Sequence, residues 1–363
     1  MKHCCINQNL IILLFIISAC QGCLSDEPGP SANFTINDTS ELLVYLESKG
    51  DYINNTTTFS LIEAPEVFAS LNDNLILDVR PSEEFAQGHI DGAINLTAGE
   101  LLDYILERDH QSYSMIVIVS SSGQSSVYYT TLLRIYGLSN VYSMKWGMAS
   151  WNPIFSSNWF NVINEQYNTT TFNNYIYEDK QYSPLPELNF DSENRDIESK
   201  LDQRVRFLLD RGFVEDPSWH VYSDASISLT ELLERWDPNL QRYTDHYIVC
   251  MMLDLYFYEQ SGWMTNPGHP PTTILYQALI PISEFRSNLL LQTIPRDETT
   301  IIYGYNGHFS AAFTAYFKIL GYDVKSILFG YNRMHYGRML EYDCFHEYLF
   351  GQDKIHNFPY TTE

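Results

Sequence analysis

Short, continuous apolar runs bounded by glycine, proline and small polar residues dominate the hydrophobic pattern of the chain. Residues 75–77 and 115–119 form two such runs, and residues 300–303 form a third. Runs of this length without alternation are typical of strands buried on both faces of a parallel sheet. Apolar residues with helical spacing follow over 127–136 and 311–320, and each segment ends at a glycine. Strands that alternate with helices predict an α/β fold.

The chain contains an internal repeat. Gly88-His89 recurs as Gly268-His269, at an offset of 180 residues. Three more glycines recur at offsets of 184, 184 and 183 residues: Gly123 as Gly307, Gly137 as Gly321, and Gly147 as Gly330. The repeat predicts two copies of one domain, each a parallel sheet with helices on both faces. We expect each copy to have its own core and the two to meet through a secondary interface.

The domain boundaries follow from these patterns. The prediction is a signal peptide over 1–19, a lipid anchor and tether over 20–58, a first domain over 59–155, a linker over 156–198, a second domain with a leading helix over 199–345, and a C-terminal tail over 346–363. The linker is rich in Asn, Thr and Tyr and has no clear period. Ile197, Leu201 and Val205 share one helical face, and Gly212 stands where a helix would end, which predicts the leading helix.

The N-terminal residues indicate a compartment. The apolar run over 10–19 is about half as long as the roughly 20 residues that span a bilayer, so it indicates a signal peptide. Residues 17–20, Ile-Ser-Ala-Cys, resemble the prokaryotic lipobox, in which a cysteine after small residues becomes lipidated. Cys20 is the expected lipidation site and Cys23 the alternative acceptor; an ordinary secretory signal also stays open. We therefore expect a lipid-anchored protein on the extracytoplasmic side of the cell membrane.

Composition and charge exclude several classes of protein. With 45% hydrophobic and 18% charged residues, the chain is globular rather than disordered. Forty-five acidic against 21 basic residues give a net charge of −24, and no run rich in Lys or Arg occurs, so nucleic acid is not an expected partner. Beyond Cys23 only Cys250 and Cys344 remain, which predicts no disulfide framework and no metal site; we also expect no cofactor.

Several motifs of the first copy together resemble the rhodanese pattern. They are Leu-Asp-Val-Arg-Pro at 77–81, Glu84-Phe85, Gly88-His89-Ile90, Gly-Ala-Ile-Asn at 92–95, the strand and loop at 115–126, and Trp146-Gly147. The second copy is similar through Gly268-His269-Pro270, the loop at 304–310, residues 320–326, and Phe329-Gly330. Tandem copies behind a lipobox resemble the rhodanese-like lipoproteins of bacteria and archaea.

The resemblance implies a sulfurtransferase site at the loop after the central strand. In the family, a loop cysteine carries sulfur as a persulfide, and backbone N–H groups and a helix N-terminus stabilise its thiolate. That cysteine lies three residues before the loop glycine, a place taken here by Ser120 in the first copy and Gly304 in the second. Neither residue can carry a persulfide, so we expect no catalytic residue at either loop. A cysteine placed at 120 should have a depressed pKa if the loop keeps its shape.

Without the cysteine, the loops remain candidate anion-binding sites. The candidate residues are Ser120, Ser121, Ser122, Gly123, Gln124, Ser125 and Ser126 in the first copy, and Gly304, Tyr305, Asn306, Gly307, His308, Phe309 and Ser310 in the second. A relic turn without a ligand is the alternative. Asp78 and Arg80 are expected to pair near the first loop, and Cys250 and Met252 are expected to hold their places in the second copy.

Two functions from different classes follow. The favoured one is a catalytically silent module that binds a small anion or a protein partner. The alternative is a sulfurtransferase that uses Cys250 or Cys344. Cys250 follows apolar residues and is predicted to be a buried thiol, and the acidic neighbours of Cys344 should raise its pKa. His89 and His269 are predicted to be structural hydrogen-bonding residues rather than catalytic ones.

Overall fold

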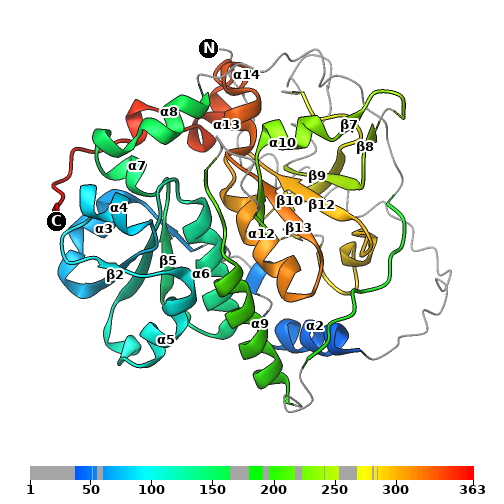
Figure 1. Ribbon diagram of the computed structural model, residues 1–363, viewed down its shortest axis with the longest axis horizontal. Helices are drawn as coiled ribbons and strands as arrows, with labels where there is room; N and C mark the ends of the chain where they lie inside the picture. Colours follow the sequence, from blue (N-terminus) through cyan, green and yellow to red (C-terminus); the bar gives the residue numbers. More distant parts are fainter. Residues whose placement is uncertain are drawn as a thin grey trace, which may run out of the picture.

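The computed structural model describes residues 37–50, 52–54, 60–163, 180–190, 196–216, 223–240, 242–252, 268–279, 282–283 and 285–363. The predicted signal peptide, Cys20 and Cys23 lie outside these residues. Two α/β lobes stand side by side, one built around each of two parallel sheets (Figure 1). No helix among the described residues is both long and apolar enough to cross a membrane.

The sheet of the first lobe contains five parallel strands. Their order is β1 (Leu61–Ile62), β5 (Val141–Met144), β4 (Met115–Val119), β2 (Asn74–Asp78) and β3 (Ile94–Asn95). The helices of this lobe are α3 (Ala64–Ala69), α4 (Ser82–Gln87), α5 (Leu101–Leu106), α6 (Gln124–Tyr136), α7 (Met148–Trp151) and α8 (Ser157–Ile163). Successive residues of β4 alternate between two clusters, Ile116 with α5 and α6, and Val117 with α3 and α7. Helices therefore cover both faces of the sheet.

The second sheet has the same strand order, with one further strand at its edge. It runs β6 (Ser226–Ile227), β13 (Val324–Ile327), β12 (Thr299–Tyr303), β9 (His246–Met252), β10 (Ile274–Leu279) and β11 (Ile282–Ser283), and β11 alone is antiparallel to its neighbour. Its helices are α10 (Leu229–Glu234), α12 (His308–Ile319), α13 (Gly330–Met334) and α14 (Tyr336–Met339), and β7 (Trp236–Asp237) pairs with β8 (Arg242–Tyr243). The predicted fold class, two α/β domains with parallel sheets, is confirmed.

Short 3-10 helices complete the connections. They are η1 (Tyr52–Asn54), η2 (Leu71–Asp73), η3 (Ala98–Glu100), η4 (His110–Ser112), η5 (Pro153–Phe155), η7 (Leu291–Thr293), η8 (Asp343–Tyr348) and η9 (Gln352–Lys354). Helix α8 and residues 180–190 lie within the predicted linker, 156–198, and the predicted leading helix is α9 (Ile197–Arg211).

Part of the predicted tether is folded. Within 20–58, residues Asp38–Ser48 form α2, capped by the Asn37 side chain. Leu42, Leu43 and Leu46 bury one face of this helix. The ammonium of Lys200 on α9 lies 2.7 Å from a carboxylate oxygen of Asp38 and also pairs with Glu41. The tether prediction was therefore wrong from Asp38 onward, because the apolar face of α2 joins the core.

The two lobes share one core. Figure 1 shows α6 and α12 side by side between the sheets. One buried cluster contains Ile116 from the first sheet, Ile302 from the second, and apolar residues of both helices. The expected separate cores are thus present only on the outer faces of the sheets. The buried residues Ala311 and Ala312 of α12 belong to the same cluster as the apolar residues of α6, so the interface is part of the core rather than secondary.

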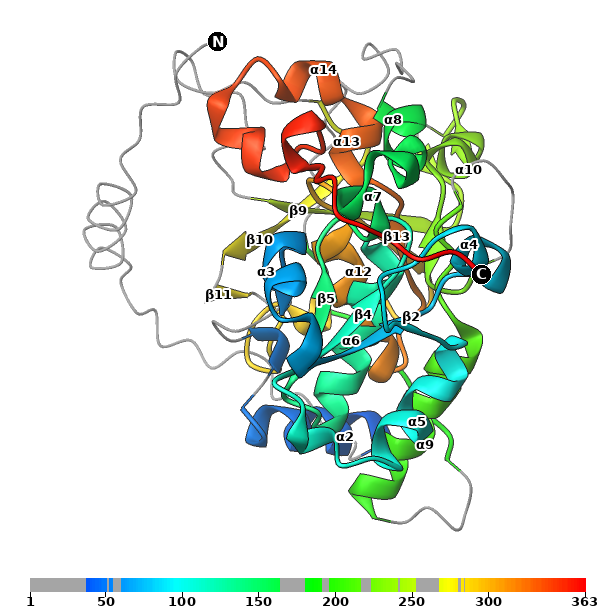
Figure 2. The same ribbon diagram turned by 90° about the vertical axis from the view of Figure 1, so that its left-hand side faces the viewer.

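The C-terminal residues return to the first lobe. Figure 2 shows this segment crossing from the second lobe over α7 to end near α4. Thr361 and His89 exchange backbone hydrogen bonds of 2.9 Å, and the indole Nε1 of Trp151 donates to the Pro359 carbonyl at 2.7 Å. The Phe358 ring stacks on Phe68 with 4.3 Å between centroids. The end of the predicted tail, 346–363, therefore fastens the second lobe to the first.

Candidate functional site

The first candidate loop joins β4 to α6. Ser120 follows the last strand residue, and Gly123 precedes the helix with φ of 89°, a conformation that favours glycine. Gly147 packs against the loop from the next connection, where an added Cβ would lie 2.2 Å from the Ser120 carbonyl oxygen. The backbone N–H of Met148 donates to that same oxygen at 2.9 Å. Two glycines thus let the chain form this tight loop at the carboxyl edge of the sheet.

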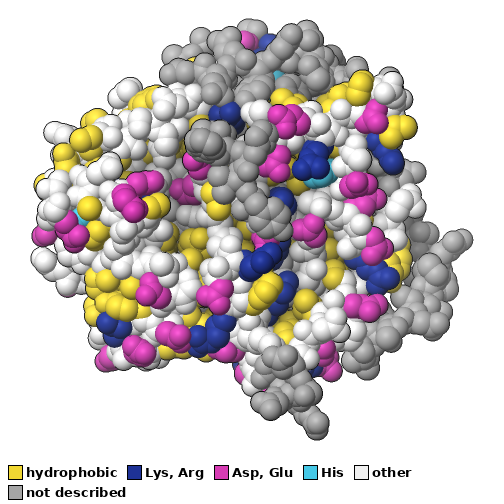
Figure 3. All heavy atoms as spheres, in the orientation of Figure 1, with side chains coloured by type: hydrophobic (Ala, Val, Ile, Leu, Met, Phe, Trp, Pro, Cys, Tyr) yellow, Lys and Arg dark blue, Asp and Glu magenta, His cyan; other side chains and the backbone are white. Residues whose placement is uncertain are grey.

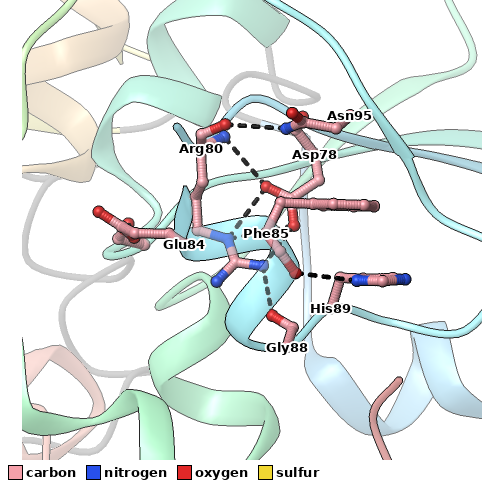
Figure 4. Close-up of polar contacts among 8 residues, drawn as sticks. Asp78, Arg80, Glu84, Phe85, Gly88, His89 and Asn95 are labelled. Atoms are coloured by element: carbon pink, nitrogen blue, oxygen red, sulfur yellow. Dashed lines mark hydrogen bonds and ion pairs between the residues drawn. The ribbon is translucent and has the colours of Figure 1, made fainter. Parts of the chain in front are cut away.

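Asp78 and Arg80 form the predicted ion pair beside the loop. Arg80 Nη2 lies 2.6 Å from Asp78 Oδ2, and the two side chains are 3% and 1% exposed. The same nitrogen donates to the Gly88 carbonyl at 2.8 Å, and the Asn95 amide donates to the backbone carbonyls of Asp78 and Arg80 (Figure 4). These contacts turn the guanidinium toward Asp78 and Gly88. The pair supports the chain around the loop rather than offering a free cation.

His89 has a structural role, as predicted. Its Nδ1 donates to the Phe85 carbonyl at 2.9 Å, and its ring stacks on the Phe85 ring with 3.8 Å between centroids (Figure 4). The side chain is buried. With one nitrogen bonded to the backbone and the ring covered, His89 fixes the end of α4.

A carboxylate from another part of the chain occupies the first loop. Glu215 Oε1 accepts hydrogen bonds from the Ser125 N–H at 2.5 Å and the Ser120 hydroxyl at 2.8 Å. Its other oxygen accepts from the Ser122 N–H at 2.9 Å. The N–H of Gly123 donates to Ser120 Oγ at 3.1 Å. The loop therefore has the converging donors of an anion cradle, and the anion in it is the chain's own Glu215.

The charge around this loop is negative. The Ser121 hydroxyl donates to Glu84 Oε2 at 2.7 Å, which places a second carboxylate at the rim. Within the described part of the chain, no lysine or arginine forms an ion pair or hydrogen bond with Glu215. Figure 3 shows acidic and basic side chains interspersed over the face of the molecule that it draws. A second free anion at the loop would meet repulsion from both carboxylates.

The second candidate loop lies at the equivalent place between β12 and α12. Gly307 has φ of 86°, and the N–H groups of Tyr331 and Asn332 donate to the carbonyls of Gly304 and Tyr305. Serine pairs in the two lobes match: Ser126 with Ser143, and Ser310 with Ser326, each with 2.7 Å between hydroxyl oxygens. The Asn306 side chain accepts from the His308 N–H at 3.2 Å, the Tyr305 ring stacks on Tyr348, and Phe309 packs against the core. The second loop keeps the turn but has no side chain at 304.

The two loops meet between the lobes. Gln124 Oε1 accepts from the Phe329 N–H of the second lobe at 2.7 Å. His308 Nε2 donates to the Ser122 carbonyl of the first lobe at 3.2 Å. Burial lowers the pKa of His308 to about 3, so the imidazole is neutral at ordinary pH. The Trp159 indole also donates to the Ser122 carbonyl, at 3.3 Å, which encloses the first loop further.

Cys250 takes the place of Asp78 in the second lobe. Asp78 pairs in register with Val119 on β4, and Cys250 pairs with Tyr303 on β12, the equivalent strand. The thiol is fully buried and burial raises its pKa to about 12. Its Sγ lies 3.9 Å from the Tyr331 hydroxyl. Cys250 is thus the buried thiol that the sequence predicts.

Two other second-lobe candidates, His269 and Met252, contact Tyr331, as Cys250 does. His269 Nδ1 lies 2.9 Å from the Tyr303 hydroxyl and also bonds to Tyr331, so it belongs to a buried network as predicted. Met252, at the place of Arg80, is buried and contributes no charge. Cys344 lies in η8, and its side chain is outside the described residues. No group of three or more His, Cys, Asp or Glu side chains suited to a metal occurs in the described ranges.

A family model and several known proteins match about a quarter of the chain. The rhodanese-like domain model matches residues 63–153. The thiosulfate sulfurtransferase GlpE of Pseudomonas aeruginosa is 31% identical over 100 residues, which cover 27% of this chain and 88% of the relative. GlpE of Shewanella oneidensis is 35% identical over 77 residues, or 21% and 74% of the two chains.

Two solved structures match parts of the chain with low TM-scores. A rhodanese-related protein from Thermoplasma volcanium is 28% identical and matches 24% of this chain and 84% of its own, with a TM-score of 0.21. A thiosulfate sulfurtransferase from Pseudomonas aeruginosa is 15% identical and matches 81% of this chain and 46% of its own, with a TM-score of 0.28.

Proposed function

The chain belongs to the rhodanese-like family, and we propose that it is a lipid-anchored member that binds a ligand or partner and transfers no sulfur. The observation that carries this proposal is the contact between Ser120 and Glu215. It puts a hydroxyl where the family has its cysteine, with a carboxylate 2.8 Å away.

Sulfur transfer at the first loop would need a nucleophile and room for an anion. A serine hydroxyl is barely ionised at neutral pH and forms no stable analogue of a persulfide. Glu215 occupies the donors that would stabilise an incoming anion, and Glu84 adds negative charge. Both the chemistry and the electrostatics therefore disfavour catalysis at this loop.

The second lobe supports the same conclusion. Its repeated strand order and matching serine pair favour a degenerate second copy of the rhodanese-like domain. Gly304 offers no side chain at the nucleophile position. A thiol with a pKa near 12 is almost wholly protonated at neutral pH, so Cys250 is not a substitute nucleophile. Neither copy supplies a reactive thiolate among the described residues.

The N-terminal sequence supports an external location. A short apolar run followed by Ala19-Cys20 fits lipidation, and a lipid anchor would hold the lobes outside the cytoplasmic membrane. In that position the lobes would present their surfaces to ligands and partners on the extracytoplasmic side.

A thiosulfate:cyanide assay on the full chain in detergent tests the proposal. We expect thiocyanate formation no faster than in a matched Cys250→Ser, Cys344→Ser variant. Turnover by the unmodified chain that this double substitution abolishes would contradict the proposal and establish the alternative sulfurtransferase.

A further inference from the structure

Residues 213–215 follow α9 and lie across the start of α6. We call this segment the strap. Phe213 is buried, and its ring packs against Tyr128 with 5.4 Å between centroids. Its N–H donates to the Tyr129 hydroxyl at 2.8 Å, and that hydroxyl is 3.4 Å from the Phe213 carbonyl. The strap is therefore docked by an aromatic side chain and by its backbone before Glu215 reaches the loop.

The strap is also fastened to the second lobe. The Ser226 hydroxyl, on β6, donates to the Val214 carbonyl at 2.6 Å. Residue 214 thus bonds to one lobe while residues 213 and 215 bond to the other. Residues on both sides of the strap thus fix the position of its backbone next to the first loop.

Glu215 is held by dipoles rather than by an opposite charge. Three donors on the first loop bind its two oxygens, two of them backbone N–H groups. Hydrogen bonds to an ionised acceptor are roughly twice as strong as neutral ones. The same donors cannot bind a second anion while the carboxylate is present. Removing the carboxylate would leave the N–H groups of Ser122 and Ser125 without their acceptor, whereas the Ser120 hydroxyl could still donate to Ser126 Oγ at 3.2 Å. Two convergent N–H groups without an acceptor favour a replacement anion.

We propose that Glu215 is an intramolecular plug that closes the first loop to small oxyanions. The excluded ligand is an anion that presents two or more oxygens to the three donors, as a carboxylate or a sulfur oxyanion does. The inference rests on the proposed function, because it describes how the non-catalytic loop is kept closed.

Titration calorimetry of the full chain in detergent, with sodium thiosulfate at constant ionic strength, tests the plug. We expect no measurable binding to the unmodified chain and binding at least about tenfold tighter to Glu215→Ala. Sodium acetate is the second probe, and its binding to the same variant would show that the site accepts carboxylates. Glu84→Ala is the matched control, because it removes a carboxylate at the rim of the same loop and leaves Glu215 in place; it should not gain binding.

Glu215→Gln provides a second variant that keeps the side-chain volume if Glu215→Ala fails to fold. Its amide carries no charge and presents only one oxygen, so thiosulfate should displace it more readily than it displaces the carboxylate. The plug would be overturned if thiosulfate bound the unmodified chain as tightly as it binds Glu215→Ala. It would also be overturned if Glu84→Ala gained as much binding as Glu215→Ala. So would folded Glu215 variants that bind neither anion. Turnover of thiosulfate by the unmodified chain would instead contradict the proposed function, so the two failures are distinguishable.

Discussion

Gln124 and His308 occupy equivalent positions in the two lobes, and each side chain bonds to the opposite lobe. Each residue directly follows the loop glycine, Gly123 or Gly307, and begins the helix. Gln124 accepts the Phe329 N–H, whereas His308 donates to the Ser122 carbonyl. An added Cβ at Gly307 would lie 2.1 Å from Gln124 Oε1, so the glycine also makes space for the opposite side chain. The reciprocal contacts lock the two loops together at the interface.

Loss of the Gln124 contact should destabilise the fold. Gln124→Ala would leave the buried Phe329 N–H without its acceptor, at a cost of about 1–3 kcal/mol. We expect a lower urea midpoint with little change in the slope of the transition. Gln111→Ala, at an exposed residue of η4, is the matched control and should unfold like the unmodified chain. Equal midpoints for both variants would show that the interlobe bond is not formed in solution.

His308 should make stability depend on pH. Its pKa is about 6.5 in an unfolded chain and about 3 when folded, because burial disfavours the imidazolium. Between these values the unfolded state binds more protons, so stability falls as the pH decreases from about 6.5 toward 3. The expected slope is at most about 1.4 kcal/mol per pH unit for this residue.

Urea midpoints at pH 7.5 and 5.5 would measure this effect before most carboxylates titrate. His335, whose pKa burial lowers to about 4, should contribute in the same direction. His308→Asn should reduce the difference between the two pH values, and His335→Asn should reduce it further. A difference that neither substitution changes would assign the pH dependence to other groups.

The repeated fold could be predicted because its signals are local. The buried strands, the loop glycines at 123 and 307, and the offset between copies are all visible in the sequence, and so are the residues of the Asp78 and Arg80 pair. The shared core could not be predicted in the same way. An apolar helix face indicates that another element covers it but does not identify that element. For α6 the covering element is α12 of the other lobe.

The occupant of the first loop was not predictable from local pattern. Glu215 lies 95 residues after Ser120, in a short segment with no periodicity. Its sole local signal is an acid soon after the helix-ending Gly212, one of 45 acidic residues in the chain. The prediction that residues 120–126 bind an anion was based only on the hydrogen-bond donors of the loop. The acceptor, the Glu215 carboxylate, is brought to the loop by the fold and is visible only in the structure.

The lipid anchor gives a prediction about location. Replacement of both candidate acceptors, Cys20→Ala with Cys23→Ala, should prevent lipidation and leave either a released protein or an unprocessed precursor. Fractionation of cells with an antibody to the lobes would measure this, and each single substitution identifies which cysteine is used. A double variant that stays in the membrane fraction fully processed would show that the lipoprotein assignment is wrong.

A cysteine introduced at 120 should report the charge of the loop. Donation from the Gly123 N–H, 3.1 Å from the position of Ser120 Oγ, and the α6 N-terminus favour a thiolate, the helix end by about 0.3–2 kcal/mol. Glu215 Oε1, 2.8 Å from the same position, opposes it with about 6 kcal/mol at an effective dielectric constant of 20. Repulsion is the larger effect. Ser120→Cys should therefore have a pKa above the free-cysteine value of about 8.5, opposite to the expectation from the sequence alone.

Alkylation by iodoacetamide against pH measures this pKa, in a background with Cys23, Cys250 and Cys344 replaced by serine. Adding Glu215→Ala should reverse the sign and bring the pKa of the new thiol below about 8.5, because the N–H groups then act unopposed. Gly304→Cys is the control in the second loop, where Glu215 makes no contact, and Glu215→Ala should leave its titration unchanged. A thiol at 120 that titrates below free cysteine with Glu215 intact would place the carboxylate away from the loop. If instead it titrates like free cysteine in both backgrounds, the backbone donors do not converge on residue 120 and the loop is no anion cradle.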